Sequence, residues 1–325
     1  MKGIQYLRDW ALIIAMVSGV AGYFIFVNIP LLERASAFAR EAVDFLQPAL
    51  IFMMLFFTFC KIDPHHLRLS PWHGWLLLIQ CGLFTLIGLV LVCLPHSHLR
   101  VVLEGAMICF ICPTATAAAV ITRKLGGNVE QITTYTILIN LAAALLIPAL
   151  LPFVHPNPDM TVFNASMLIL GKVFPLLLLP LVLALLVRYL APPLHAQLLR
   201  MQDAPFYLWL VALTLAMVVT TRSIVHSQVP LSTQGWLVVV SLASCALQFW
   251  AGRKIGAVYG DKVTAGQALG QKNTVLAIWL GYTFFTPITS IVGGFYSIWH
   301  NLVNSYQLYK AQHRPKAEGS SAQHA

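Results

Sequence analysis

One lysine lies deep inside an apolar stretch of the chain, where an ionisable side chain is costly. Lys272 stands about nine residues into a stretch that begins at Thr264, which at the rise of an α-helix places its ammonium roughly 13 Å below a membrane surface. Ionisable residues at such a depth usually serve binding or coupling. Around it, Gly270, Gln271 and Asn273 complete a polar interruption that is typical of a helix unwound beside a cavity. We therefore predict a functional site here.

A second interruption lies upstream, within residues 105–123. Pro113 removes a helical hydrogen bond, and the hydroxyl of Thr114 can cap a helix that restarts after it. The segment Cys112-Pro113-Thr114 is therefore predicted to break a second helix.

The composition indicates an all-α polytopic membrane protein. Of the 325 residues, 58% are hydrophobic and only 10% are charged, and apolar runs long enough to cross a bilayer recur along the chain. We predict ten transmembrane helices, at residues 10–29, 43–60, 73–94, 101–121, 130–154, 166–190, 204–221, 233–252, 264–286 and 288–307.

The two interruptions occupy the fourth and the ninth of these spans, which are equivalent positions in two five-helix halves, 10–154 and 166–307. Because five is odd, the second half must be inserted upside down relative to the first. Matched interruptions in two inverted repeats indicate a transporter whose discontinuous helices cross at the site.

The basic residues predict the orientation of these spans. With a cytoplasmic N-terminus, the outer loops carry only Arg34, Arg40, Arg100 and Arg222, and the other loop lysines and arginines face inward. Residues 1–9 and the polar tail 308–325 are then cytoplasmic, the tail is predicted to be disordered, and the location is the inner (plasma) membrane. The net charge of +9 follows from this orientation, so it gives no support to nucleic-acid binding.

Several classes of site are not supported by the sequence. The six cysteines fall in or at the ends of spans without a CxxC motif, so we predict neither a disulfide framework nor a metal site, and no cofactor. Motifs of membrane hydrolases and of nucleotide-dependent enzymes are absent, so we do not expect an enzyme. Glu104 and Glu130 lie near span ends, where we expect them at the membrane interface.

The chain resembles the bile acid:sodium symporter family over nearly its whole length. The resemblance rests on Phe52 to Asp63, Gln80, Cys112-Pro113-x-x-Thr116-Ala117, Gly270-x-x-Asn273 and Trp299-His300-Asn301-Leu302. It implies a core domain of six helices that holds the two crossing broken helices, a panel domain of four, and transport of organic anions that is usually driven by sodium. The implied substrate contacts are Thr116, Asn273, His300 and Asn301.

The departures from the family pattern concern the sodium ligands. Where relatives have Ser, Asn, Glu and Gln, this chain has Ala118, Ala119, Ala268 and Lys272, and of the ligands that the resemblance implies only Gln80 and Thr136 remain. Alanine methyls offer sodium no oxygen. We expect sodium-independent transport of a small or amphipathic organic anion, with a coupling site of Lys272, Gln271, Gln80 and Thr136.

Two functions of Lys272 are open. Its ammonium can replace the sodium ion as a fixed charge, or burial can favour the neutral amine, in which case a proton becomes a coupling partner. Gln80, Thr116 and Asn273 also have a plain structural interpretation as hydrogen-bonding residues between helices.

Two other functions stay open at this point. A membrane sensor derived from a transporter would also lose its coupling-ion ligands. Metalloid efflux, which related ten-helix carriers perform with a cysteine near the fourth-helix break, is the other alternative, and Cys112 is its candidate ligand.

Overall fold

The computed structural model describes residues 10–29, 36–201 and 203–313, and these residues form helices without a β-strand. In chain order the elements are α2 (Ala11–Asn28), α4 (Ser36–Cys60), η1 (Pro64–His66), α5 (Pro71–Cys93), α6 (Arg100–Ile111), α7 (Ala118–Lys124), α8 (Val129–Val154), α9 (Val162–Leu190), α10 (Pro192–Arg200), α11 (Ala204–Val225), α12 (Leu231–Val258), α13 (Lys262–Gly270), α14 (Thr274–Phe284), η2 (Pro287–Ser290) and α15 (Ile291–Gln312).

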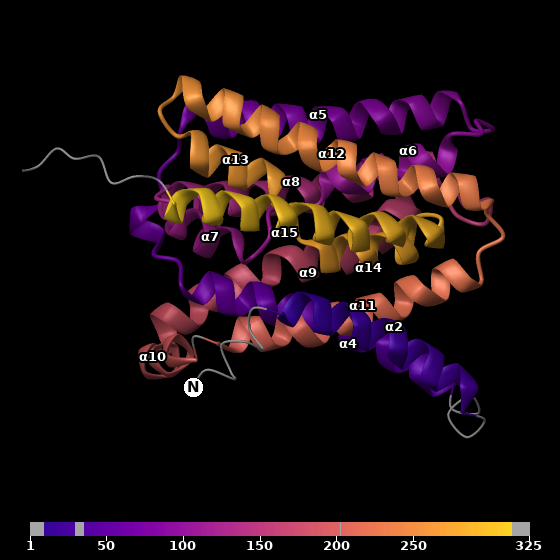
Figure 1. The fold of residues 1–325 in the computed structure, drawn as a ribbon, viewed down its shortest axis with the longest axis horizontal. Coiled ribbons are helices and arrows are strands. Elements are labelled where there is room, and N and C mark those ends of the chain that lie inside the picture. The colour runs from indigo at the N-terminus through magenta and orange to yellow at the C-terminus, as the bar shows by residue number, and fades with distance from the viewer. Residues whose placement is uncertain (1–9, 30–35, 202, 314–325) are drawn as a thin grey trace, which may run out of the picture.

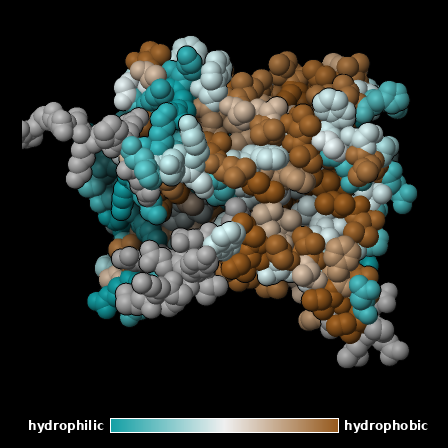
Figure 2. All heavy atoms as spheres, viewed as in Figure 1, coloured by the Kyte–Doolittle hydropathy of each residue, from teal (hydrophilic) through white to brown (hydrophobic). Residues whose placement is uncertain are grey.

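The lengths and composition of these helices suit a bilayer. Within the described residues, six helices are long and apolar enough to cross a membrane, namely α4, α5, α8, α9, α11 and α12. Shorter apolar helices occur at 13–28, within α2, and at α14. Hydrophilic residues gather toward the ends of the helix bundle, whereas hydrophobic residues cover its middle (Figure 2).

Local sequence explains where several helices begin. The side chain of Asn128 accepts a hydrogen bond from the backbone of Gln131 at the start of α8, and Thr161 accepts from Asn164 at the start of α9. Ser70 and His73 form reciprocal capping bonds at the start of α5. These caps satisfy amides that would otherwise lack partners at each helix start.

The helices pack in two groups (Figure 1). The first group holds α2, α4, α9 and α11, in which α2 packs on α11, and α4 packs on both α9 and α11. The second group is built around α12, which contacts α13, α15, α6 and α5. Helix α8 contacts both α9 and α5, and α14 contacts α11 as well as α15, so the two groups share an interface.

Two details differ from the sequence-based expectations. The short helix α10, between the predicted sixth and seventh spans, was not predicted. The prediction of a disordered tail from residue 308 is wrong for residues 308–312, which continue α15 because the apolar pattern extends through Leu308. Residues 1–9 and 314–325, which carry the rest of the terminal predictions, lie outside the described part of the chain.

Candidate functional site at two broken helices

The first break separates α6 from α7. Helix α6 ends at Ile111, and Cys112 leaves the helical conformation with φ −59° and ψ 125°. The following residue, Pro113, explains this conformation, because a proline disfavours the α region for the residue before it. Helix α7 does not begin until Ala118, so six residues of nonhelical chain lie between the two halves.

The second break separates α13 from α14. Helix α13 ends at Gly270, and Gln271 is extended with φ −96° and ψ 106°. Asn273 starts α14, because its side-chain oxygen accepts a hydrogen bond from the backbone of Leu276 at 3.2 Å. The segment between the two half-helices is therefore short and extended.

The two breaks pair with each other through their backbones. The N–H of Asn273 donates to the carbonyl of Pro113 at 2.9 Å, and the N–H of Ala115 donates to the carbonyl of Gln271 at 2.9 Å. Backbone groups inside a membrane must find partners within the protein. The pairing supplies those partners, so each break satisfies groups that the other exposes.

Side chains strengthen this pairing. Thr114, whose backbone forms an antiparallel bridge with that of Lys272, donates its hydroxyl to the carbonyl of Ala268 at 2.7 Å. The thiol of Cys112 donates to the carbonyl of Asn273 at 3.0 Å. The prediction that Thr114 caps the restarted helix is wrong: Ala117 precedes α7 and makes no capping bond, and the hydroxyl of Thr114 is used across the break instead.

Gly270 lies where the chain has no room for a side chain. A Cβ at this position would approach the ring of Phe249 to 2.4 Å. Its carbonyl accepts a hydrogen bond from the hydroxyl of Tyr296 at 2.8 Å, and Tyr296 comes from α15. The sequence indicated the polar interruption but not Tyr296, because a single tyrosine in a span resembles any packed aromatic residue.

Lys272 is buried at the pairing of the two breaks. The residue is 1% exposed, and its Nζ has no hydrogen-bond partner among the described residues. The titratable side chains near enough to interact with its charge are thiols, those of Cys81, Cys109, Cys112 and Cys245. Within the described part of the chain, the ammonium therefore has no carboxylate as a counter-ion.

Gln80 connects the first break to two other helices. Its side-chain N–H donates to the carbonyl of Cys112 at 3.0 Å, and its oxygen accepts from the hydroxyl of Tyr135 at 2.8 Å. Thr136, the neighbour of Tyr135, instead donates its hydroxyl to Ile132 within its own helix at 2.8 Å. The residue that supports Gln80 is thus Tyr135, which sequence reasoning missed because its partner is 55 positions away.

Two of the residues implied as substrate contacts, Thr116 and Asn273, lie in the breaks, and the other two lie on α15. Thr116 is half-buried in the nonhelical segment before α7, and Asn273 is 5% exposed. His300 is buried on α15 with its ring 5.8 Å from that of Tyr296. The side-chain N–H of Asn301 donates to the carbonyl of Ser297, one turn earlier in the same helix, at 2.7 Å.

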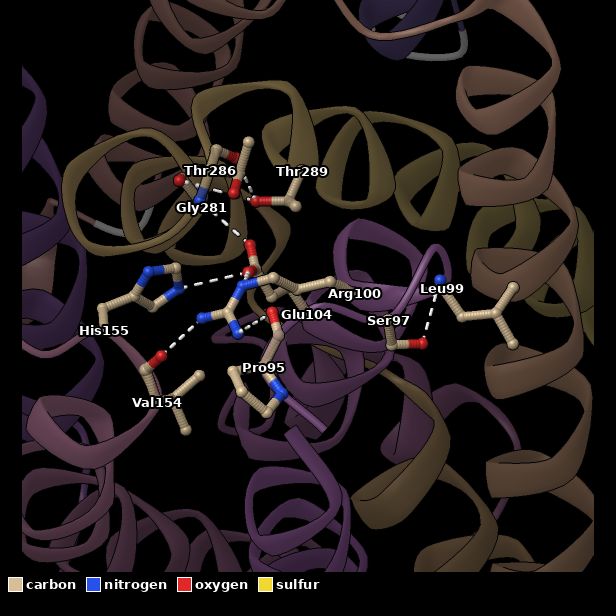
Figure 3. Close-up of polar contacts among 10 residues, drawn as sticks. All are labelled: Pro95, Ser97, Leu99, Arg100, Glu104, Val154, His155, Gly281, Thr286 and Thr289. Atoms are coloured by element: carbon tan, nitrogen blue, oxygen red, sulfur yellow. Dashed lines mark hydrogen bonds and ion pairs between the residues drawn. The ribbon is translucent and has the colours of Figure 1, made fainter. Parts of the chain in front are cut away.

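A second polar cluster joins the far ends of α6 and α14 (Figure 3). The carboxylate of Glu104 lies 3.1 Å from Nε of Arg100 and 3.3 Å from Nε2 of His155, and it accepts from the backbone N–H of Thr286 at 3.1 Å. Arg100 also donates to the carbonyls of Pro95 and Val154. This is the second connection between the two broken segments.

The side chain of Glu104, one turn after the start of α6, is fully buried within the protein. Burial is possible because Arg100 and His155 bring compensating groups to its oxygens. By contrast, Glu130 is exposed at the start of α8.

Residues 20–293 match the SBF-like CPA transporter family. The chain belongs to this family. The match covers the second half of α2, the rest of the four-helix group, both breaks and the start of α15, and it confirms the resemblance to the bile acid:sodium symporter-like proteins that the motifs indicated. No curated protein matches the chain. This SBF-like protein is a multi-pass membrane transporter, in keeping with its family and its apolar helices.

Proposed function

We propose that the protein is a secondary transporter that moves a small or amphipathic organic anion by alternating access, without sodium. The proposal includes ten spans in two inverted five-helix repeats, with α6 and α7 as the two halves of one span and α13 and α14 as the halves of another. The four-helix group α2, α4, α9 and α11 corresponds to a panel domain and the remaining spans to a core. Both termini face the cytoplasm across the inner membrane.

The burial of Lys272 between the two breaks is the observation that carries this proposal. Helices α6 and α13 both end at the breaks, so their carboxyl ends direct partial negative charge toward this region. A cation is favourable at such a place, and the family resemblance puts sodium there. An ammonium on the chain itself supplies the same charge permanently.

The residues around Lys272 argue against a bound sodium ion. Sodium needs several oxygen ligands, and three of the positions that the resemblance assigns to them are Ala118, Ala119 and Ala268. Gln80 retains its amide, but Cys112 and Tyr135 already occupy both of its ends. Sodium independence follows from this shortage of ligands. Whether Lys272 acts as a fixed charge or exchanges a proton is decided by the pH dependence of transport.

The preference for an anion rests on charge and on helix direction. Helix α14 begins at the second break, so its amino end contributes partial positive charge beside Lys272. Thr116, Asn273, His300 and Asn301 are the proposed contacts of the substrate. Gln271, buried with its side-chain oxygen unpartnered among the described residues, is a further polar group on this segment.

Uptake into proteoliposomes tests the proposal. A thermal-shift screen of the purified protein against carboxylic acids and bile salts first selects a substrate, because a ligand that binds the folded state raises its midpoint. Uptake of that compound in radiolabelled form is then measured with sodium and with choline, each with and without a pH gradient. Equal uptake in sodium and choline is expected. A large stimulation by sodium contradicts the proposal, and stimulation by the pH gradient alone assigns the proton as the coupling ion.

A sensor is the second candidate, because lost coupling-ion ligands also suit a protein that no longer transports. Counterflow separates the two functions: labelled compound enters vesicles preloaded with unlabelled compound only if the protein exchanges it across the membrane. Saturable binding without counterflow supports the sensor.

Metalloid efflux is less well supported. No group of three or more His, Cys, Asp or Glu side chains in the described part of the chain is placed to hold a metal ion. The thiol of Cys112 is buried and bonded to the carbonyl of Asn273. Arsenite resistance that disappears in Cys112→Ser would nevertheless restore this function.

A further inference from the structure

Helix α10 lies across the direction of the long helices. It connects α9 to α11 at one end of the bundle, and Figure 1 shows it almost end-on whereas α4, α9 and α11 run across the view. Pro192 and Pro193 start it directly after α9, which separates it from that span. Its axis is therefore close to the plane in which a membrane surface would lie.

The sequence of α10 is amphipathic, and none of its residues is fully buried. Leu194 and Leu198 lie four residues apart on one side of the helix, Leu199 lies at the edge of the same broad apolar side, and Arg200 lies away from it. Leu198 packs against the core of the bundle, whereas Leu194 is 46% and Leu199 37% exposed beside it.

Polar contacts hold α10 at the end of α4. Nε2 of His195 lies 2.8 Å from the carbonyl oxygen of Cys60, the last residue of α4. Just before α10, Arg188 donates to the carbonyl of Ile62 at 2.8 Å and forms an ion pair with Asp63 at 3.0 Å. These contacts fix the depth of α10 relative to the spans.

A hollow of about 510 Å³ lies at the carboxyl end of α10, lined by Arg200, Met201, Asp203, Ala204 and Tyr207. Arg200 is exposed and its guanidinium has no hydrogen-bond or ion-pair partner among the described residues. The carboxylate of Asp203 interacts with the ammonium of Lys61, which offsets its negative charge. The hollow therefore presents an exposed arginine beside the exposed apolar side chains of Met201 and Tyr207.

We propose that α10 is an interfacial helix and that the hollow at its end binds the headgroup phosphate of an anionic phospholipid. Leu194 and Leu199 would enter the acyl layer, as in amphipathic helices that lie in the membrane interface. Arg200 would then reach the phosphate level, with Tyr207 beside it at the same depth. This binding site goes beyond the proposed transport function and does not depend on it.

A lipid titration tests the site. Detergent-purified protein is mixed with short-chain phosphatidylglycerol, with short-chain phosphatidylcholine, or with inorganic phosphate, and the unfolding midpoint is followed. Phosphatidylglycerol is expected to raise the midpoint most, and Arg200→Gln to weaken its apparent affinity about fivefold, the effect of one basic residue near an anionic surface. Arg222→Gln, which removes the same charge near the other end of α11, should keep the wild-type response.

Each of the other results overturns the proposal. An equal response of Arg200→Gln and wild type shows that the lipid binds elsewhere. An equal response to phosphatidylcholine shows that anionic charge is not recognised. Stabilisation by inorganic phosphate that matches phosphatidylglycerol shows a site for the free ion instead of a lipid.

The depth of α10 is tested separately. A spin label is placed at Leu199→Cys in protein carrying Cys93→Ser, because Cys93 is the exposed native cysteine of the described chain. In liposomes the label should be more accessible to oxygen, which concentrates in lipid, than to a water-soluble nickel chelate. Preferential access of the chelate would place α10 in water and overturn the interfacial assignment.

Discussion

Asn273 donates its backbone N–H to the carbonyl of Pro113 at 2.9 Å, which joins two segments that lie about half the chain apart in the sequence. Neither segment can complete its backbone hydrogen bonds alone, because each has left the helical conformation. The two breaks therefore form one structural unit. A change in one break should therefore disturb the other break.

Replacing Lys272 by methionine removes the charge and keeps most of the side-chain length. Because the ammonium is buried without a hydrogen-bond partner among the described residues, its removal should leave the unfolding midpoint unchanged or raise it. Uptake should nevertheless be lost, as it should in Lys272→Gln, with normal amounts of protein in the membrane. Lys172→Met is the control, since Lys172 is exposed beside the ring of Phe284. Normal uptake by Lys272→Met would remove this residue from the mechanism.

A methyl group at residue 270 should separate the two breaks from α12. Gly270→Ala places a Cβ 2.4 Å from the ring of Phe249, and overpacking of this kind costs about 1–3 kcal/mol of stability. The unfolding midpoint should fall and uptake should decrease, and Phe249→Leu in the same protein should partly restore both. Gly171→Ala is the matched control, because no atom lies within 4 Å of a Cβ at that position. An unfolding midpoint equal to that of the wild type for Gly270→Ala would contradict the prediction, because it would show that the ring of Phe249 moves aside at little cost.

Glu104→Gln should destabilise the polar cluster that connects α6 to the segment after α14. The amide keeps the shape of the side chain but leaves Arg100 without its counter-charge and His155 without a carboxylate partner, and breaking a buried ion pair costs about 3–5 kcal/mol. Because Arg100 is 24% exposed, the loss should lie toward the lower end of that range. Chemical unfolding in detergent measures it. Glu130→Gln, at an exposed position, should have little effect, and similar midpoints for the two variants would contradict a stabilising role for the cluster.

The pair of Asp63 and Arg188 should make stability sensitive to acid. The pKa of Asp63 is lowered in the folded protein, chiefly because the backbone N–H of His65 donates to its carboxylate and also because of the charge of Arg188. A lowered pKa contributes stability that is fully present above the unfolded value of about 4 and is lost as the pH falls through the folded value.

The unfolding midpoint of the wild type should fall as the pH is lowered from about 5 to 3. In Asp63→Asn this fall should be smaller. Melting curves across that range measure the effect. Asp159→Asn removes the same charge from an exposed loop and should leave the decline as in the wild type. Parallel curves for Asp63→Asn and the wild type would mean that the charge of Asp63, with its contacts to His65 and Arg188, contributes nothing to the acid dependence.

The interruptions were predictable because their signals are local. Pro113 constrains Cys112 directly, and the polar residues around Lys272 cannot continue a lipid-facing helix without cost. The role of Thr114 was predicted wrongly for the same reason: local reasoning assigned its hydroxyl to the next helix, whereas the closer acceptor belongs to Ala268, 154 residues away. Tyr135, Tyr296 and the burial of Glu104 were beyond sequence reasoning, since each depends on a partner from another helix.

By itself, the sequence determined the membrane class, the approximate positions of the long apolar helices and the two breaks, because hydrophobic length and helix-breaking residues act over a few turns of chain. Only the tertiary structure decided that the breaks face each other, that the titratable neighbours of the ammonium among the described residues are thiols, and that α10 lies across the long helices. These features depend on which helices pack together, and an apolar stripe on one helix does not specify the partner that will cover it.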